Sequence, residues 1–573
     1  MDFIKMLSGT PGAAKLLLLL LMVPVIGSLG VWGISLYGQT IPGNGWRDRR
    51  DAIIWTCCSL TLLGVLALRP YWGTEFILLG SGGVGYSFGI DGLRYVLAAL
   101  VSTLWLLSSL FSRWYLAQSS HKMRYYFFFL LGENGILCVL FSADLYTLLT
   151  GFVVLNLACW VLTGHRESEA ARMAGTRALI GAVAGGLCAL LGILLLTNLL
   201  GTVRFSALRV LGYTCKNREL LYLGGFLVLI GISISCAVWP LPKRMPSATF
   251  APGPAAALLA GAVTVAWMFS AMVLSGLLFW WDSLWGFFLA GLGIFMTVSG
   301  AVSAAFHTNL KKTLTMLSVS QTGLILLTLG LNCLLADKNH LAAEAVVLQC
   351  LHHGLCQMVL FLCAGTICLH QPDLSLSSLC GFGRGKKALF AGFALAGASL
   401  CGVPLFFGSI NLTLLQKALH SFIITLPADG YGIQTFQLIS WLVIFSCGAS
   451  VAAIIKLLVC LFGKRNADPA LQARYDALNE RGLSKLVQVL LVCSGVVLLL
   501  AGLTAPYTLR QIAYNCVGFF STLLSGPLTA FEVLPFVLAG LYLVIGGLLY
   551  LLFLHRPLKK MAEPKPKNDE SSC

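Results

Sequence analysis

A few ionisable residues lie inside long apolar runs, where a side chain that binds and releases a proton could carry it across a membrane. Glu133 lies near the middle of run 125–143, and His352 and His353 lie within run 341–369. A carboxylate at membrane depth costs several kcal/mol unless it is paired or protonated, and imidazole titrates near physiological pH. These side chains are candidates for a proton pathway, and a hydrogen-bonded structural group is the alternative for each.

Other charged residues lie closer to the ends of the apolar runs. Lys311 is a further pathway candidate, although with Lys312 it stands at a helix start, where we expect both side chains to point to water. Lys456 is predicted to extend its ammonium to water along the protein surface. Asp91 and Asp144 lie near the ends of helical runs, where helix capping or local hydrogen bonding is the expected role.

Metal and cofactor chemistry have little support in the sequence. The 19 cysteines are scattered, and no Cys-x-x-Cys spacing occurs. Because a buried cysteine usually serves as a small hydrophobe, we expect no metal and no cofactor. Residues 80–85 spell Gly-x-Gly-x-x-Gly, but a dinucleotide site requires a surrounding β-α-β unit, so a flexible loop is expected there.

Composition explains why charged residues are so rare. The chain has 573 residues, of which 58% are hydrophobic and 10% are charged, whereas soluble domains carry about 25% charged residues. The formal net charge of +16 comes from basic residues in short loops, as the positive-inside rule requires of a membrane protein. The sequence therefore predicts a lipid-embedded protein, and nucleic acid is not an expected partner.

The pattern of apolar runs predicts an all-α polytopic membrane protein with 14 to 16 spanning helices, since a span needs about 20 residues. The first run, 16–36, is interpreted as a retained span, and stretch 507–528 is the weakest. The distribution of Lys and Arg favours an N-terminus outside and a cytoplasmic C-terminal tail. The expected division is N-terminal transmembrane helices (1–84), a core (85–465), C-terminal transmembrane helices (466–562) and a disordered tail (563–573).

Six segments within the core resemble, in order, the proton-conducting family that contains antiporter-like subunits of complex I, Mrp-type cation/proton antiporters and membrane hydrogenases. They are Phe-Gly-Ile-Asp-Gly-Leu-Arg (88–94), a run with Ser-Ala-Asp-Leu-Tyr (138–147), Ala-Pro-Gly-Pro-Ala-Ala-Ala-Leu-Leu-Ala-Gly (251–261), and segments 309–323, 353–365 and 399–408. The resemblance implies two inverted five-helix repeats, each with one broken helix.

Prolines offer a physical reason for such breaks. Pro240 and Pro242 interrupt one predicted span, and Pro404 interrupts another. A mid-helix proline removes a backbone hydrogen bond, and in a bilayer the freed carbonyls persist only where protein or water satisfies them. Broken helices in corresponding halves are typical of ion-pathway folds, while prolines that merely kink packing helices are the alternative.

The resemblance also implies a row of charged residues at mid-membrane that passes protons, and here the chain departs from the family. The positions where the family carries these charged groups hold neutral residues, namely Val153, Ser235, Val265, Gln357 and Leu412. A neutral side chain cannot hold or release a proton, so the ordinary pumping mechanism of the family is not expected.

Three functions remain open on these observations. The first is a membrane-arm subunit of a complex I-like, hydrogenase-like or Mrp-like ion-translocating assembly. It would dock against the other membrane subunits of that assembly in a bacterial plasma membrane. Such a subunit would be structural or weakly proton-conducting, and not catalytic alone. The second is an active translocator of protons or sodium ions that uses relocated groups such as Glu133 and His353. The third is a solute transporter that reuses the fold.

Overall fold

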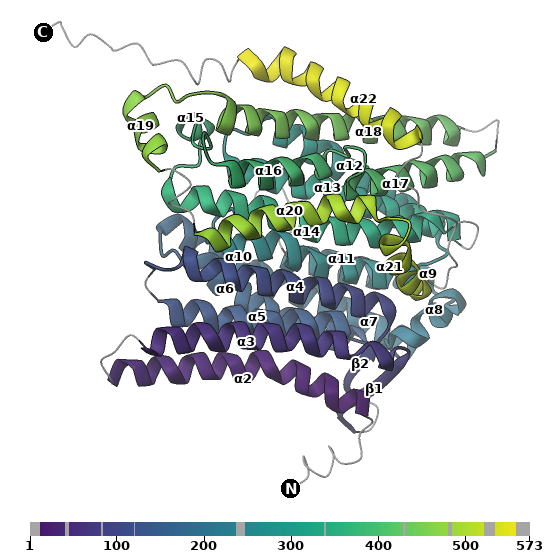
Figure 1. Ribbon diagram of the computed structural model, residues 1–573. Helices are drawn as coiled ribbons and strands as arrows, with labels where there is room; N and C mark the ends of the chain where they lie inside the picture. Colours follow the sequence, from purple (N-terminus) through teal and green to yellow (C-terminus); the bar gives the residue numbers. More distant parts are fainter. Residues whose placement is uncertain are drawn as a thin grey trace, which may run out of the picture.

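A computed structural model of the chain describes residues 12–40, 45–81, 84–119, 121–236, 247–336, 340–427, 431–478, 484–520 and 533–556. Within this part of the chain, 14 helices are long and apolar enough to cross a membrane. Most lie side by side with their axes nearly parallel (Figure 1). The chain is therefore an integral membrane protein, and the all-α polytopic fold predicted from composition is confirmed.

The helices of the first half form one side of the bundle. They are α2 (Gly12–Thr40), α3 (Gly45–Ala67), α4 (Gly92–Tyr115), α5 (Lys122–Phe141), α6 (Leu145–Gly164), α7 (Glu169–Leu200) and α9 (Arg218–Ser235), followed by one span built from α10 (Gly253–Leu258), the π-helical turn η3 (Leu259–Val263), α11 (Thr264–Val273) and the π-helical turn η4 (Leu274–Leu278).

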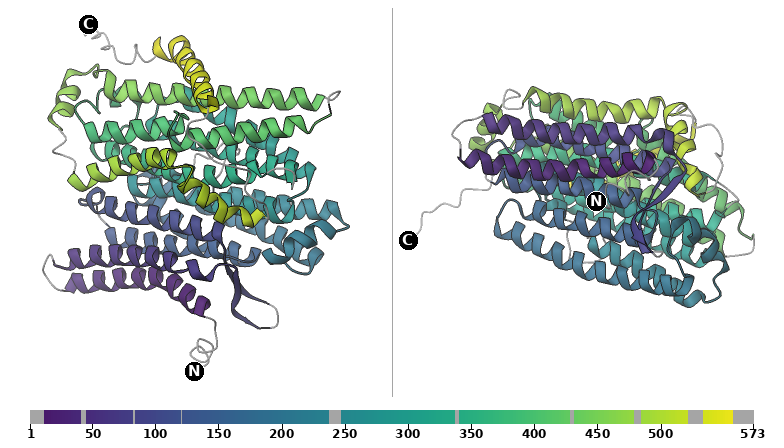
Figure 2. Two further views of the ribbon diagram at one scale, coloured as in Figure 1. Left: turned by 45° about the vertical axis from the view of Figure 1, so that its right-hand side comes forward. Right: turned by 90° about the horizontal axis from the view of Figure 1, so that it is seen from below.

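The second half supplies the remaining long helices and, in addition to those 14, one pair of helices that follow each other in a single crossing. They are α12 (Ser283–Phe306), α13 (Leu310–Leu335), α14 (Leu341–His370), the pair α16 (Lys387–Leu400) and α17 (Phe407–Ile424), α18 (Tyr431–Leu458) with η6 (Val459–Gly463), α20 (Lys485–Leu503), and α22 (Val533–Leu549) with η9 (Tyr550–Leu554). In both side views α2 and α3 lie along one edge of the bundle, and α18 and α22 lie along the opposite edge (Figures 1 and 2).

Short helices lie in the connections between spans. They are η1 (Arg69–Tyr71), α8 (Phe205–Thr214), η2 (Ser247–Thr249), α15 (Leu376–Leu379), α19 (Pro469–Ala477), α21 (Thr508–Val517) and η8 (Gly518–Phe520). The weak stretch 507–528 is thus represented by the short helices α21 and η8 and not, in its described part, by a span.

One element is not helical. Strands β1 (Thr74–Ser81) and β2 (Val84–Ile90) pair antiparallel, with Thr74 opposite Ile90. The glycine-rich segment predicted as a flexible loop therefore belongs largely to a β-hairpin. The hairpin is anchored to α6, because the Ser87 N–H donates to Asp144 Oδ2 and to Thr147 Oγ1, each at 3.0 Å.

Capping side chains begin several spans as predicted. Asp91 accepts from the Arg94 N–H at 2.7 Å, and Asp144 accepts from the Thr147 N–H at 2.8 Å. Each carboxylate satisfies a backbone donor that the first helical turn leaves free. The capping roles expected for these aspartates are confirmed.

Small residues bring α12 and α13 into close contact. A Cβ atom added at Gly293 would lie 2.3 Å from Leu327 N, and one added at Gly323 would lie 2.5 Å from Thr297 N. Helices in a membrane associate through such small residues, because lipid supplies no hydrophobic driving force between them.

Both predicted helix breaks can be compared with the helix ends in the structure. The second is observed, since α16 ends at Leu400, α17 begins at Phe407, and Pro404 lies between them. In the first half α9 ends at Ser235, but Pro240 and Pro242 lie outside the described residues. The first half also contains an irregularity that the sequence did not predict, the π-helical turn η3 in the span after α9.

Candidate functional site

His353 lies on α14 against the π-helical turn η3. Its Nε2 is 3.2 Å from Ala260 O and 3.0 Å from Thr264 Oγ1. A carbonyl can only accept a hydrogen bond, so Nε2 carries the ring proton in this arrangement. The side chain is 1% exposed, and Nδ1 has no hydrogen-bond partner among the described residues. Nδ1 is thus a buried lone pair able to accept a proton. π-Helical turns inside α-helices are frequent at functional sites.

His352, the preceding residue, faces a different element. Its Nε2 is 3.0 Å from Ser399 Oγ at the end of α16. The same hydroxyl accepts a hydrogen bond from the Gly408 N–H, at 3.3 Å, in the first turn of α17. His352 therefore contacts the broken helix, whereas His353 contacts the π-helical turn.

Two buried side-chain amides lie on the same helices as these groups, α14 and α17. Gln357 on α14 and Asn411 on α17 are 0% and 2% exposed, and no protein group among the described residues bonds to either amide. Neutral amides can orient water or another polar group, but they cannot hold a net proton.

Glu133 occupies a separate position on α5. The Cys58 thiol on α3 donates to its Oε2 at 3.5 Å, and Oε1 has no hydrogen-bond partner among the described residues. The side chain is 0% exposed. No hydrogen bond joins it to His352 or His353 within the described part of the chain, so the structure does not bring the predicted pathway residues together.

Two lysines are buried, contrary to expectation. Lys311 is 0% exposed and donates to Ala251 O at 2.7 Å. Lys456, at 4% exposed, donates to Ala305 O at 2.7 Å and to His307 O at 2.6 Å at the end of α12. The predictions that these ammonium groups reach water are wrong, because each is buried and bonds to backbone carbonyl oxygens from a distant part of the chain, one for Lys311 and three for Lys456.

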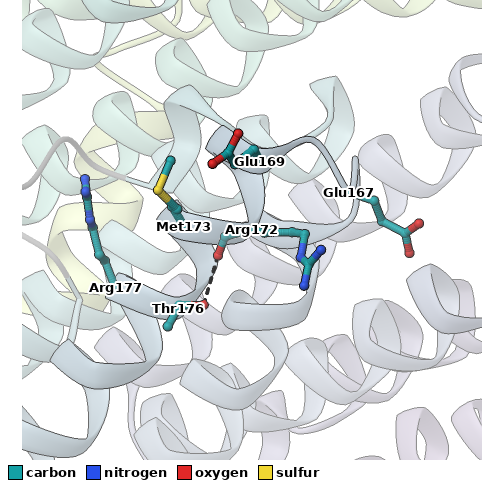
Figure 3. Close-up of a pocket in the computed structure, with 6 residues that line it drawn as sticks. All are labelled: Glu167, Glu169, Arg172, Met173, Thr176 and Arg177. Atoms are coloured by element: carbon teal, nitrogen blue, oxygen red, sulfur yellow. Dashed lines mark hydrogen bonds between the residues drawn. The ribbon is translucent and has the colours of Figure 1, made fainter.

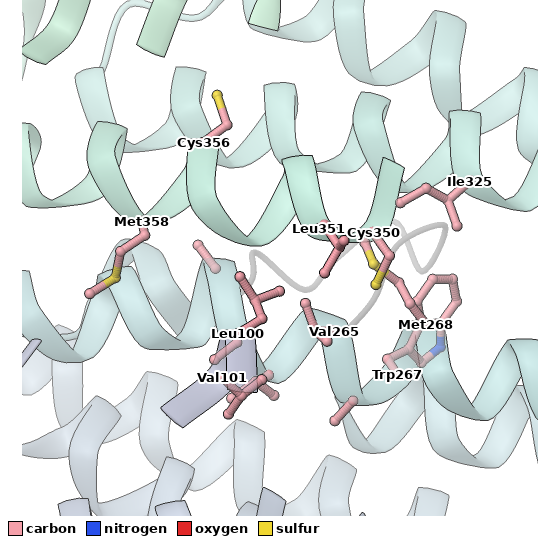
Figure 4. Packing of buried hydrophobic residues seen from close by; sticks show 14 of the residues in the cluster. Leu100, Val101, Val265, Trp267, Met268, Ile325, Cys350, Leu351, Cys356 and Met358 are labelled. Atoms are coloured by element: carbon pink, nitrogen blue, oxygen red, sulfur yellow. The ribbon is translucent and has the colours of Figure 1, made fainter. Parts of the chain in front are cut away.

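The residues that we expect at the family's charged positions pack against neighbours or face outward. Val153 on α6 is 60% exposed, and the Ser235 hydroxyl donates to Ala182 O of α7 at 3.4 Å. Val265 and Leu412 are both buried. Figure 4 shows Val265 among apolar side chains that include Leu100.

Charged side chains gather instead at the start of α7, around an open cavity lined by Glu167, Glu169, Arg172, Met173, Thr176 and Arg177 (Figure 3). Thr176 Oγ1 donates to Arg172 O at 3.0 Å within the helix. Nearby, Arg124 lies 2.7 Å from Glu167 and holds the pKa of that carboxyl below its ordinary value. These groups lie at the end of the bundle and outside the buried polar site.

Sequence reasoning missed three members of the site, namely Thr264, Ser399 and Asn411. Ser399 lies in segment 399–408, which carries part of the resemblance, so a signal for it was present. Its partners could not be read from that segment, because His352 is 47 residues away along the chain.

Comparisons with known proteins agree with this architecture. The sequence model of the NADH:quinone oxidoreductase/Mrp antiporter transmembrane family matches residues 142–427. One relative, a probable K(+)/H(+) antiporter protein of Rhizobium meliloti, is 27% identical over 70% of this chain and 39% of that protein. Another, from the NADH-quinone oxidoreductase of Buchnera aphidicola, is 24% identical over 64% of this chain and 59% of that protein.

Solved structures share the fold. A chain of the Mrp complex from Dietzia superposes with a TM-score of 0.77 at 19% identity, covering 96% of this chain and 57% of that one. A chain of an archaeal membrane-bound sulfane sulfur reductase superposes with a TM-score of 0.73 at 18% identity. The match covers 88% of this chain and 98% of that one. The chain spans about half the length of the curated antiporter relatives that it matches. The sequence match over residues 142–427 and the shared fold relate this chain to the antiporter-like membrane proteins of the Mrp and complex I family.

Proposed function

We propose that this chain is a membrane-arm subunit of an ion-translocating assembly of the complex I-like, hydrogenase-like or Mrp-like kind. Its work would be chiefly structural, with at most weak proton conduction. The carrying observation is that the fold is kept, and the proposal rests on the resemblance, which aligns the neutral residues Val153, Ser235, Val265, Gln357 and Leu412 with the family's charged positions.

The surroundings of two of these positions, Val265 and Ser235, support a scaffold. Val265 packs in an apolar core and Ser235 bonds to a neighbouring helix, so neither offers a protonatable group. Apolar and small neutral side chains form stable helix contacts in lipid. A row of such residues preserves the shape needed to dock against other membrane subunits.

Weak conduction would rest on His353. Its buried Nδ1 can accept a proton while Nε2 holds another toward Thr264 and Ala260. A ring that accepts at one nitrogen and releases from the other can pass a proton along. Active translocation that also uses Glu133 is the second candidate, and the observation in its favour is the unpartnered Oε1 of that carboxyl among the described residues.

We also propose an orientation in a bacterial plasma membrane. Lys122, Lys312, Lys387 and Lys485 stand at or near the starts of α5, α13, α16 and α20. With α16–α17 counted as one span, these are alternate helices, which begin at the same end of the bundle. The positive-inside rule makes that end cytoplasmic, so the N-terminus lies outside and the C-terminal tail inside.

The test is ion flux in liposomes that contain the intact membrane assembly. Proton and sodium fluxes would be compared for wild type, Glu133→Gln, His353→Gln and the control Glu169→Gln, which makes the same chemical change at an exposed site. A scaffold with weak conduction predicts that the proton flux of the assembly falls only slightly, and in His353→Gln alone. A large fall in Glu133→Gln, with assembly intact, would favour active translocation.

A further inference from the structure

The break between α16 and α17 holds the chain in an unfavourable backbone conformation. Leu405 has a φ of 71°, in the left-handed region that bulky residues rarely occupy. Such a residue persists only where its surroundings hold it in place. Specific bonds must therefore hold this segment.

Three groups meet at the start of α17. The Ser399 hydroxyl accepts the Gly408 N–H at 3.3 Å and lies 3.0 Å from His352 Nε2. A hydroxyl that accepts one bond keeps its own O–H to donate, so Ser399 can bond Gly408 and His352 at the same time. This node of Ser399, Gly408 and His352 links α14, α16 and α17.

Close packing leaves the node little freedom. A Cβ atom at Gly408 would lie 1.8 Å from Ser399 O and 3.1 Å from His352 Nε2. The His352 ring also meets the Phe407 ring edge to face, at 5.5 Å between centroids. His352 thus packs against both residues that begin α17.

The two adjacent histidines differ in what their ring nitrogens can do. With Ser399 donating its O–H, His352 Nε2 uses its lone pair at the break, and the ring proton then lies on Nδ1, so this ring keeps no free lone pair. His353 Nε2 is engaged with Ala260 and Thr264, while its Nδ1 has no partner among the described residues. A proton acceptor needs a free lone pair, and His353 offers one.

We propose that His352 is a positioning residue, which with Ser399 holds the first turn of α17 against α16 across the break, while His353 alone exchanges protons. Proton exchange by His353 rests on the proposed weak conduction, whereas the positioning role of His352 does not. In the apolar membrane interior, the backbone groups freed by the helix break form hydrogen bonds only with partners such as the Ser399 hydroxyl. His352 therefore contributes geometry rather than proton transfer.

The test uses amide hydrogen exchange and proton flux on the intact assembly. Exchange would be followed in the peptide that contains Gly408 for wild type, His352→Leu, His352→Gln and Ser399→Ala. Leucine and alanine cannot bond at the node, so we expect exchange about tenfold faster, the effect of losing one typical hydrogen bond. Glutamine can replace Nε2 with its amide and should restore the wild-type rate.

Flux then separates the two histidines. His353→Gln should lower proton flux, whereas His352→Gln should leave it unchanged. A fall in His352→Gln as large as in His353→Gln would overturn the assignment, and so would unchanged exchange in both His352→Leu and Ser399→Ala. If His352→Leu does not assemble, His352→Asn replaces it, because its amide is too short to reach Ser399.

The readouts also separate this inference from the proposed function. Wild-type liposomes without proton flux, combined with faster exchange in Ser399→Ala, would refute the weak conduction and leave the positioning role of His352 standing. Normal wild-type proton flux, combined with unchanged amide exchange in the node variants, would refute the positioning role of His352 and leave the weak conduction standing.

Discussion

The Cys58 thiol on α3 donates a hydrogen bond to the Glu133 carboxyl on α5, 3.5 Å away, and no cation faces that carboxyl among the described residues. The contact ties one edge of the bundle to its interior. Within the described part of the chain, no hydrogen bond joins Glu133 to the histidines of α14, with which it was predicted to act.

Glu133 should tolerate loss of its ionisable group but not reversal of its charge. Glu133→Gln keeps an acceptor for Cys58, so we expect little change in thermal stability. Glu133→Lys buries an unpaired ammonium, which costs several kcal/mol, and should abolish assembly. The measurement is thermal unfolding in detergent, monitored through the labelling of thiols that become accessible as the protein unfolds. The variant Glu169→Lys, at an exposed position, is the control. Equal unfolding temperatures for Glu133→Lys and this control would contradict the burial of Glu133.

Lys456 should stabilise the end of α12. Its ammonium lies against the carbonyls of Ala304, Ala305 and His307, at 2.6 to 3.0 Å. A cation at a helix C-terminus contributes up to about 2 kcal/mol when partly buried. Lys456→Met should lower the free energy of unfolding by about that amount, while Lys485→Met, at an exposed lysine, should have little effect. A matched loss in both variants would show that charge alone, and not the cap, is responsible.

Two glycines of α12 provide a matched pair for helix packing. A Cβ at Gly293 would collide with α13, whereas one at Gly291 meets nothing within 4 Å. Gly293→Ala should therefore destabilise the protein by about 1–3 kcal/mol. Gly291→Ala should be neutral or slightly stabilising, because alanine favours a helix over glycine. Thermal unfolding of both variants is the measurement, and a larger loss in Gly291→Ala would refute the α12–α13 contact.

His165 should make stability depend on pH. Burial and the nearby Arg124 lower its pKa from 6.5 to about 4, so the unfolded chain binds more protons between these values. Stability is therefore complete above about pH 6.5 and declines as pH falls toward 4. Unfolding temperatures between pH 5 and 7 should vary less in His165→Gln than in wild type, and His420→Gln, at an exposed histidine, should behave as wild type. An unchanged pH profile in His165→Gln would contradict the burial of a neutral ring.

Much of the fold could be predicted because lipid imposes simple rules on a chain. The scarcity of charge predicted the spans, and Asp91 and Asp144 predicted helix starts through their capping oxygens. Pro404 predicted the second helix break, since proline cannot continue a helix. The four-part division of the chain stays a prediction.

The hairpin and the two buried lysines could not be predicted in this way. The β1–β2 pair is anchored by Asp144 and Thr147, which belong to a later helix. Lys311 finds its acceptor 60 residues away, at Ala251, and Lys456 finds one 151 residues away, at Ala305. Local sequence patterns predict that a lysine at a helix end is exposed to water. These two lysines are buried because a carbonyl far away in the sequence accepts a hydrogen bond from each ammonium.

By itself, the sequence determined that this chain lies in a membrane and that it is helical, and it predicted neutral residues at the family's charged positions. These properties depend on the local cost of placing charge and free backbone groups in lipid. Only the tertiary structure decided that Glu133 bonds to Cys58, that His352 bonds to the broken helix, and that His353 keeps a ring nitrogen without a partner among the described residues. Those roles depend on which helices are neighbours, because a hydrogen bond forms only between groups that packing brings within about 3 Å.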